Sequence, residues 1–219
     1  MHNTVKNLIY IEERIKSKIN DLSSHKMPKI VAVSKTFGME KILPLLTYGH
    51  TDYGENKIQE ALDKWMAVKE KNESIKLHLI GKLQSNKVKF AVKIFDYIHS
   101  LDTEKLANKL AEEQIKQNKK IKLFIQVNIG NEEQKSGVKK ENIYDFYKYC
   151  KNLNLDIVGT MCIPPKDVSS QDYFLEMKKI NKELDLTDLS MGMSNDYLEA
   201  AQNNATFLRI GSKIFGERD

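Results

Sequence analysis

The chain contains 219 residues, of which 41% are hydrophobic and 30% are charged, together with ten glycines and four prolines. These proportions exclude an intrinsically disordered chain, a collagen-like repeat and a small disulfide-rich domain. One α/β barrel usually takes roughly 200–250 residues, so we expect residues 1–219 to form a single domain.

The formal net charge is +5, which by itself would suggest a nucleic-acid or membrane-surface partner. Only three of the 35 basic residues are arginines, and the lysines alternate with acidic residues along the chain. Direct base contacts mostly use arginine, so this pattern is more typical of a solvated surface. We expect no nucleic-acid partner.

The two cysteines, Cys150 and Cys162, form no CxxC motif, and the five histidines show no metal-ligand spacing with cysteines or carboxylates. Cys162 lies in an apolar run, as a buried reduced thiol does. The first residues lack the apolar stretch of a signal peptide, and no window approaches the roughly 18 apolar residues of a membrane span. The sequence predicts a cytoplasmic protein with no metal site and no membrane segment.

The chain opens with a predicted helix that ends before Pro28. Apolar residues recur there at steps of three and four, namely Leu8, Ile11, Ile15, Ile19 and Leu22. This spacing places them on one face of the helix. We infer no dimer from that face and expect a monomer.

Short apolar runs then alternate with charged, helix-like segments. The runs that indicate strands are residues 30–33, 50–53, 76–80, 95–100, 121–129, 155–163, 187–191 and 206–210. Eight β/α units of this length favour a closed (β/α)8 barrel of the TIM type, with the first helix as an addition. An open, doubly wound parallel sheet is the alternative, because periodicity does not exclude it.

In such a barrel, functional residues lie at the carboxyl ends of the strands. Lys35 directly follows the first strand, where partial desolvation makes a lysine amine nucleophilic. Asn56 follows the second strand and either caps the next helix or contacts a ligand. His78 alternates with apolar residues, which favours a hydrogen-bonded histidine inside the barrel over a catalytic base.

The last two strands are followed by glycine- and serine-containing segments, at the usual phosphate site of these barrels. Ser194 precedes a helical pattern, as an N-cap does, and free amides at a helix start bind anions. Gly211 allows close approach of the backbone, and Ser212 adds a hydroxyl donor. Arg209 stands out because arginine is rare in this chain. The alternative is that each glycine–serine pair forms an ordinary turn.

Six motifs, taken together, resemble a known family, the single-domain pyridoxal-phosphate homeostasis proteins, whose barrel is similar to the N-terminal domain of alanine racemase. The resemblance covers nearly the whole chain. The motifs are Ala32-Val33-Ser34-Lys35, Gly54-Glu55-Asn56, His78-Leu79-Ile80-Gly81 with Leu83-Gln84 and Asn86-Lys87, Gln126-Val127-Asn128-Ile129 with Lys135-Ser136-Gly137, Ser190-Met191-Gly192-Met193-Ser194, and Arg209-Ile210-Gly211-Ser212 with Ile214-Phe215-Gly216.

The resemblance implies a fold-type III barrel in which Lys35 forms a Schiff base with pyridoxal 5'-phosphate. It implies further cofactor-binding residues of three kinds. Ser194, Gly211 and Ser212 would hold the phosphate, Arg209 would lie near the ring nitrogen or the phosphate, and Asn56, His78, Met161 and Ser190 would line the pocket. The sequence departs from the family pattern at Leu77, where an aromatic residue is common, and at Ser212, where threonine is usual. Ser212 keeps the hydroxyl group.

We expect a protein that buffers or delivers the cofactor, with apo enzymes as possible recipients, and without strong turnover. Racemisation needs acid–base groups on both ring faces, and the chain ends at Asp219 without room for the domain that supplies the second group in alanine racemase. An arginine at the ring nitrogen also gives a weak electron sink. A fold-type III amino-acid racemase and a sugar-phosphate enzyme are the alternatives. A second cofactor site at Lys82 or Lys87 stays open.

Overall fold

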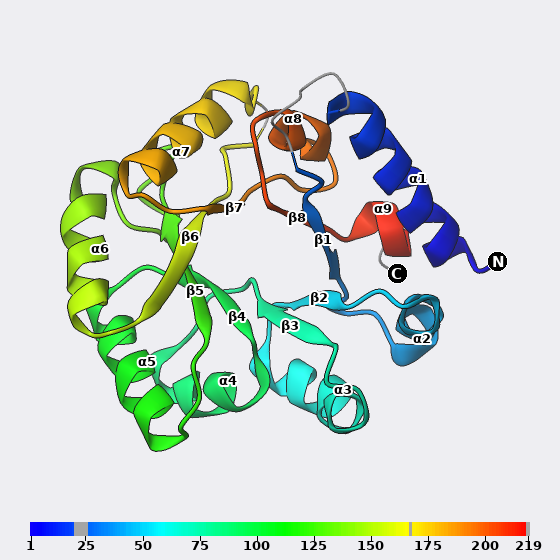
Figure 1. The fold of residues 1–219 in the computed structure, drawn as a ribbon, viewed down its shortest axis with the longest axis horizontal. Helices are drawn as coiled ribbons and strands as arrows, with labels where there is room; N and C mark the ends of the chain where they lie inside the picture. The colour runs from blue at the N-terminus through cyan, green and yellow to red at the C-terminus, as the bar shows by residue number, and fades with distance from the viewer. Residues whose placement is uncertain (20–25, 167, 218–219) are drawn as a thin grey trace.

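The computed structural model describes residues 1–19, 26–166 and 168–217, and in this part of the chain eight parallel strands close into a barrel (Figure 1). The strands pair in chain order, and β8 returns to pair with β1. Their bounds are β1 Lys29–Val33, β2 Asp52–Glu55, β3 Lys76–Leu79, β4 Tyr97–Leu101, β5 Lys122–Val127, β6 Asp156–Cys162, β7 Asp188–Ser190 and β8 Phe207–Ile210. The predicted TIM-type barrel is therefore confirmed, and the open sheet is wrong.

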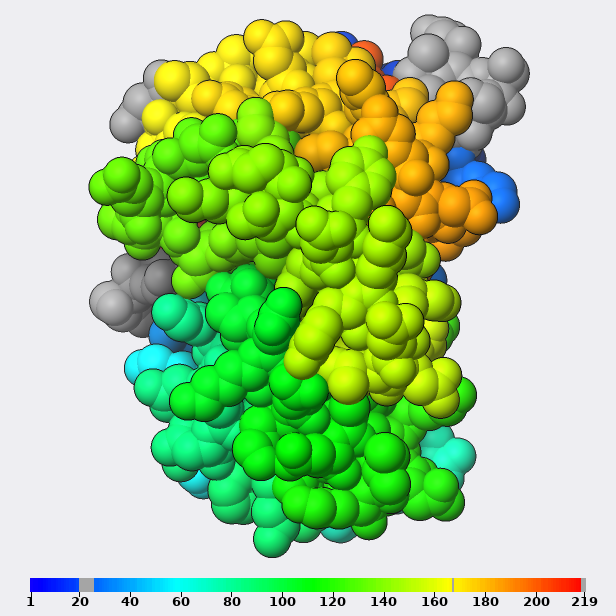
Figure 2. All heavy atoms as spheres, turned by 90° about the vertical axis from the view of Figure 1, so that its left-hand side faces the viewer, coloured from blue at the N-terminus to red at the C-terminus, as the bar shows by residue number. Residues whose placement is uncertain are grey.

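Helices surround the barrel and cover its outer face (Figure 1). Their bounds are α1 Asn3–Ile19, α2 Met39–Tyr48, α3 Ile58–Lys71, α4 Val88–Ile94, α5 Glu104–Lys116, α6 Ile143–Asn152, α7 Gln171–Glu183, α8 Tyr197–Gln202 and α9 Ser212–Phe215. Two short 3-10 turns, Ser85–Lys87 and Lys140–Asn142, lead into α4 and α6. Figure 2 shows the side on which residues of α5, α6 and α7 form the surface.

The added helix α1 packs against α2, α8 and α9, so the two ends of the described chain lie side by side (Figure 1). Its apolar face is buried within the chain, with Leu8 and Ile15 fully inaccessible to solvent. Asn7 also donates a hydrogen bond of 3.0 Å to the carbonyl of Ile214 in α9. The predicted apolar face is confirmed from Leu8 to Ile19, whereas Leu22 lies outside the described residues.

Two apolar layers hold the barrel together. The larger layer fills the space between the strands and the helices. The smaller one lies inside the barrel and consists of Val31, Tyr97, Phe124, Met161 and Phe207. Burial of apolar surface in both layers is the main stabilising contribution, at about 25 cal/mol per Å² removed from water.

The strand bounds differ from the predicted ones where a strand continues beyond its apolar residues into glycine or polar residues. Gly54 and Glu55 belong to β2, although the prediction placed them in the following loop. Gly54 fits because a Cβ there would lie 2.9 Å from a methyl group of Val31 on the neighbouring strand. By contrast, Ser190 ends β7 and Arg209 lies within β8, inside the predicted strand ranges 187–191 and 206–210.

The pairing between β7 and β8 is the least extensive of the described strand pairs. β7 has three residues, and its register with β8 joins Ser190 to Phe207. By contrast, β5 and β6 pair from Lys122 to Val127. No described helix is long and apolar enough to cross a membrane.

Candidate functional site

Lys35 lies in the loop that leaves the carboxyl end of β1, as predicted. Its side chain is half-buried, and the following residue, Thr36, has a positive φ of 68°. Such a conformation is unfavourable for a β-branched residue and persists only where neighbouring groups hold it. The loop therefore depends on contacts from outside itself.

Lys64 on α3 provides those contacts. Its ammonium group donates hydrogen bonds to the carbonyl oxygens of Ser34, at 2.8 Å, and Phe37, at 3.1 Å. Glu60, one turn earlier on α3, pairs with Lys64 at 2.7 Å and accepts a hydrogen bond from the backbone N–H of Thr36. Partial burial raises the pKa of Glu60, but these two partners outweigh it, so the net shift is downward.

A buried carboxylate, Glu55 at the end of β2, completes this arrangement. Its Oε1 atom accepts hydrogen bonds from the Ser34 hydroxyl at 2.7 Å and the Trp65 indole at 3.0 Å, and lies 2.9 Å from Lys64 Nζ. The Oε2 atom of Glu55 has no hydrogen-bond partner among the described residues. Because a buried charge is costly without partners, Lys64 is essential to the stability of this cluster.

The segments that follow β7 and β8 meet at the same end of the barrel. The hydroxyl of Ser212 donates to that of Ser194 at 3.0 Å. The prediction that Ser194 is the N-cap of α8 is wrong, because Asp196 takes that position. The Asp196 carboxylate accepts from the N–H of Met193 at 2.6 Å instead, which fixes the turn that presents Ser194.

Arg209 points into the barrel and is 4% exposed. Its two terminal nitrogens donate to the Ser190 hydroxyl at 2.7 Å and to the Cys162 carbonyl at 2.8 Å. Burial lowers the pKa of Arg209, yet a guanidinium keeps its charge in proteins. Burial also raises the pKa of the Cys162 thiol to about 12, so this thiol stays protonated and unreactive.

His78 is fully buried, and both of its ring nitrogens have partners, as predicted for a histidine inside the barrel. One nitrogen lies 3.1 Å from Asp52 Oδ1, and the other lies 3.0 Å from His99. His99 in turn contacts the Ser190 hydroxyl at 2.8 Å. Asp52, His99 and Lys64 were not among the predicted site residues, and Glu55 was named only within the motif Gly54-Glu55-Asn56. The alternation of β4 residues would have placed His99 inside the barrel with Tyr97.

Asn56 follows the end of β2, whereas Met161 lies within β6. Asn56 is not the cap of α3, because Lys57 takes that position. Its backbone packs against Gly81, where a Cβ would lie 2.4 Å from the Asn56 carbonyl oxygen. Met161 is fully buried inside the barrel and pairs in register with Ser190.

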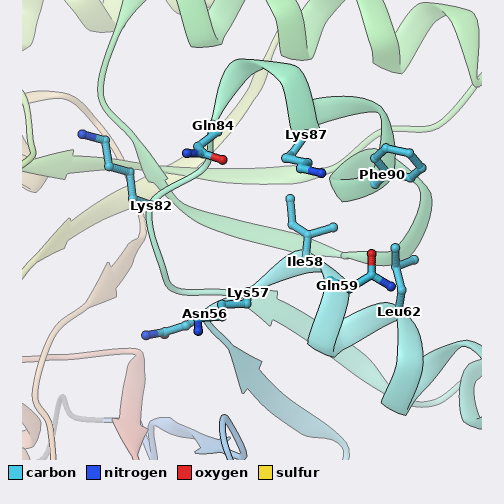
Figure 3. A pocket seen from close by; sticks show the side chains of 9 residues that line it. All are labelled: Asn56, Lys57, Ile58, Gln59, Leu62, Lys82, Gln84, Lys87 and Phe90. Atoms are coloured by element: carbon cyan, nitrogen blue, oxygen red, sulfur yellow. The ribbon is translucent and has the colours of Figure 1, made fainter.

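A pocket of about 420 Å³ opens beside Asn56, between α3 and the segment that joins β3 to α4 (Figure 3). Ile58, Gln59 and Leu62 line it from the α3 side. Lys82 and Lys87 lie across from them (Figure 3). Lys82 and Lys87, the two lysines considered for a second cofactor site, therefore line the same pocket.

A closed parallel barrel with a lysine after the first strand and hydroxyls after the last two is consistent with a barrel of the alanine racemase type, and comparison with known proteins establishes that class. Residues 12–219 match the family described as alanine racemase, N-terminal domain. Alanine racemase from Clostridium difficile has the same fold, with a TM-score of 0.72 and 14% identity over 99% of this chain and 57% of that chain.

More similar proteins define the family more narrowly. The pyridoxal phosphate homeostasis protein of Aquifex aeolicus is 38% identical over 87% of both chains, and that of Pasteurella multocida is 35% identical over 97% of both. PipY from Synechococcus elongatus, solved with pyridoxal phosphate bound, is 31% identical, with a TM-score of 0.77 over 92% of this chain and 100% of that chain. This chain belongs to the pyridoxal phosphate homeostasis protein family.

Proposed function

We propose that this protein binds pyridoxal 5'-phosphate reversibly, as a Schiff base on Lys35, and serves in pyridoxal phosphate homeostasis. The observation that carries the proposal is the position of Lys35 and the Ser194–Ser212 pair at the same end of the barrel. The names of the relatives and the pyridoxal phosphate bound in PipY support it.

The side chains at this end suit the chemistry of the cofactor. Phosphate oxygens accept hydrogen bonds, and the adjacent hydroxyls of Ser194 and Ser212 can both donate to them. Gly211 allows the backbone to approach, because nothing projects from its Cα. Bound there, the cofactor supplies an aldehyde that condenses with a lysine amine and releases water.

The surrounding residues position these groups. Lys64 and Glu55 hold the loop of Lys35, and Ser190 holds Arg209. Asn56 and Met161 complete the proposed pocket, whereas His78 acts on it through His99 and Ser190.

We further propose that the protein buffers or delivers the cofactor with little turnover, as a monomer in the cytoplasm. Arg209 supports this view, because an arginine beside the ring nitrogen keeps that nitrogen unprotonated and weakens electron withdrawal. Apo forms of pyridoxal-phosphate enzymes are the proposed recipients. The alternative, an amino-acid racemase, predicts solvent deuterium at the α-carbon of an amino acid at catalytic rates.

The test is the absorbance spectrum of the purified protein with added pyridoxal phosphate between about 300 and 450 nm, before and after borohydride. We expect a band that borohydride removes, and a pyridoxyl label on Lys35 after peptide mapping. Lys35→Ala should abolish the label, whereas Lys82→Ala and Lys87→Ala, in the neighbouring pocket, should retain it. A label on Lys82 or Lys87 in place of Lys35 would reject the assigned site.

A further inference from the structure

A continuous row of hydrogen bonds crosses the inside of the barrel, from Arg209 on β8 to Asp52 on β2. The Ser190 hydroxyl lies 2.7 Å from Arg209 Nη1 and 2.8 Å from His99 Nδ1. His99 Nε2 lies 3.0 Å from His78 Nδ1, and His78 Nε2 lies 3.1 Å from Asp52 Oδ1. All five residues are at most 8% exposed.

The two ends of the row fix the proton at every link. A guanidinium only donates, so Ser190 must accept from Arg209 and has its own proton left to donate to His99 Nδ1. An ionised carboxylate only accepts, so His78 must donate to Asp52 from Nε2. A neutral His78 then accepts at Nδ1, and His99 donates to it from Nε2. Each link thus receives one proton, with both histidines neutral and protonated at Nε2.

The surroundings favour these charge states. Burial lowers the pKa of both histidines, and the neighbouring His78 and Arg209 lower that of His99 further. Burial raises the pKa of Asp52, but hydrogen bonds from His78 and Thr51 and the charge of Lys29 on β1 outweigh it, so the net shift is downward.

The ring planes are fixed as well. His78 stacks on Tyr97 with 4.4 Å between ring centroids, and His99 stacks on Phe124 with 4.3 Å. Rings held in this way keep their nitrogens directed along the row. The two charges, one at each end, are therefore joined through three neutral groups whose dipoles all point the same way, and such chains strengthen cooperatively.

We propose that Asp52, His78 and His99 are positioning residues for Arg209, and that they couple the amino-terminal end of the barrel to the cofactor site. The negative charge of Asp52 sets the direction of both histidine links and, through them, makes the Ser190 hydroxyl donate to His99. The Ser190 oxygen is thereby held as an acceptor for the Arg209 guanidinium, which orients it. The consequence for cofactor binding rests on the proposed function, whereas the proton arrangement does not.

The first test measures the histidine ring nitrogens by NMR in the unliganded protein labelled with ¹⁵N-histidine. We expect His78 and His99 to be neutral and protonated at Nε2 at pH 7. Asp52→Asn should shift the ring nitrogen signals of His99, which it does not contact. Asp188→Asn is the matched control, because Asp188 begins β7 as Asp52 begins β2 and takes no part in the row; it should leave these signals unchanged. Protonation of His99 at Nδ1, or unchanged His99 signals in Asp52→Asn, would overturn the proposal.

The second test measures pyridoxal phosphate binding by the same variants. Asp52→Asn should weaken binding by about threefold to tenfold, as for residues coupled through one network, and Asp188→Asn should not. Wild-type affinity in Asp52→Asn would reject the positioning role. Failure of the wild-type protein to bind pyridoxal phosphate would instead reject the proposed function, while the NMR result still tests the proton arrangement.

Discussion

The ammonium group of Lys64 lies 2.9 Å from Oε1 of Glu55, and both residues also bind the loop that carries Lys35. The side chain of Lys64 is 12% exposed and that of Glu55 is fully buried. The pair therefore links the stability of the barrel to the geometry of the proposed cofactor lysine.

We predict that Lys64→Met destabilises the protein by about 3 kcal/mol, because it leaves the Glu55 carboxylate buried without its counter-charge. It should also slow the formation of the Schiff base, since Ser34 and Phe37 lose their common donor. Urea unfolding and stopped-flow absorbance measure the two effects. Lys71→Met, at the exposed end of α3, is the control and should change neither. Unchanged stability in Lys64→Met would contradict this account.

The two serines after β7 and β8 are expected to share one ligand. Ser194→Ala and Ser212→Ala should each weaken pyridoxal phosphate binding by about tenfold, the value of one hydrogen bond to a charged group. The double variant should lose less than the product of the two, because the hydroxyls contact each other at 3.0 Å. Equilibrium titration at about 400 nm measures the affinities. Wild-type affinity in both single variants would exclude these hydroxyls as phosphate ligands.

Stability should fall as the pH falls below about 6.5. Burial lowers the pKa of His78 and His99, so both are neutral in the folded protein, whereas the unfolded chain takes up their protons. Their contribution is complete above the unfolded pKa and is lost at about 1.4 kcal/mol per pH unit for each histidine as the pH decreases. Urea unfolding between pH 7.5 and 5 measures the slope. His99→Gln should reduce it, and His2→Gln, at an exposed position, should not. A free energy of unfolding that is constant across this range would refute the assignment.

Two glycines should respond differently to substitution by alanine. A Cβ on Gly159 would lie 1.8 Å from the Asp188 carbonyl oxygen on the neighbouring strand, so Gly159→Ala should cost about 3 kcal/mol. A Cβ on Gly211 would meet atoms of Val33 at 3.4 Å, so Gly211→Ala should fold normally. If the absence of a side chain at Gly211 lets a phosphate approach the backbone, Gly211→Ala should bind pyridoxal phosphate less tightly although it folds normally. Thermal unfolding measures the stability of both variants, and titration measures their affinity for pyridoxal phosphate. If Gly159→Ala lost no more stability than Gly211→Ala, the predicted clash at Gly159 would be contradicted.

The barrel was predictable because most strands are short apolar runs followed by charged helices, although β2, Asp52–Glu55, is not. The end of β2 was less predictable, because a polar side chain at a strand end, such as that of Glu55, resembles a loop residue in sequence.

Among the candidate site residues, Lys35 was predicted from its position after the first strand, and Arg209 from its rarity. Asp52, His99 and Lys64 were missed because their roles depend on partners distant in sequence, such as Ser190 and Ser34. Residue type and spacing carry no information about such pairs until the topology is known.

The limited pairing of β7 with β8 gives the ligand a role in the folding equilibrium itself. Ser194 follows β7 and Ser212 follows β8, so a phosphate held by both would fasten together the two strands with the least extensive pairing. Opening of the barrel at this junction would then require release of the cofactor. The amide protons of β7 would exchange with solvent more slowly in the loaded protein, by the factor with which binding lowers the open population.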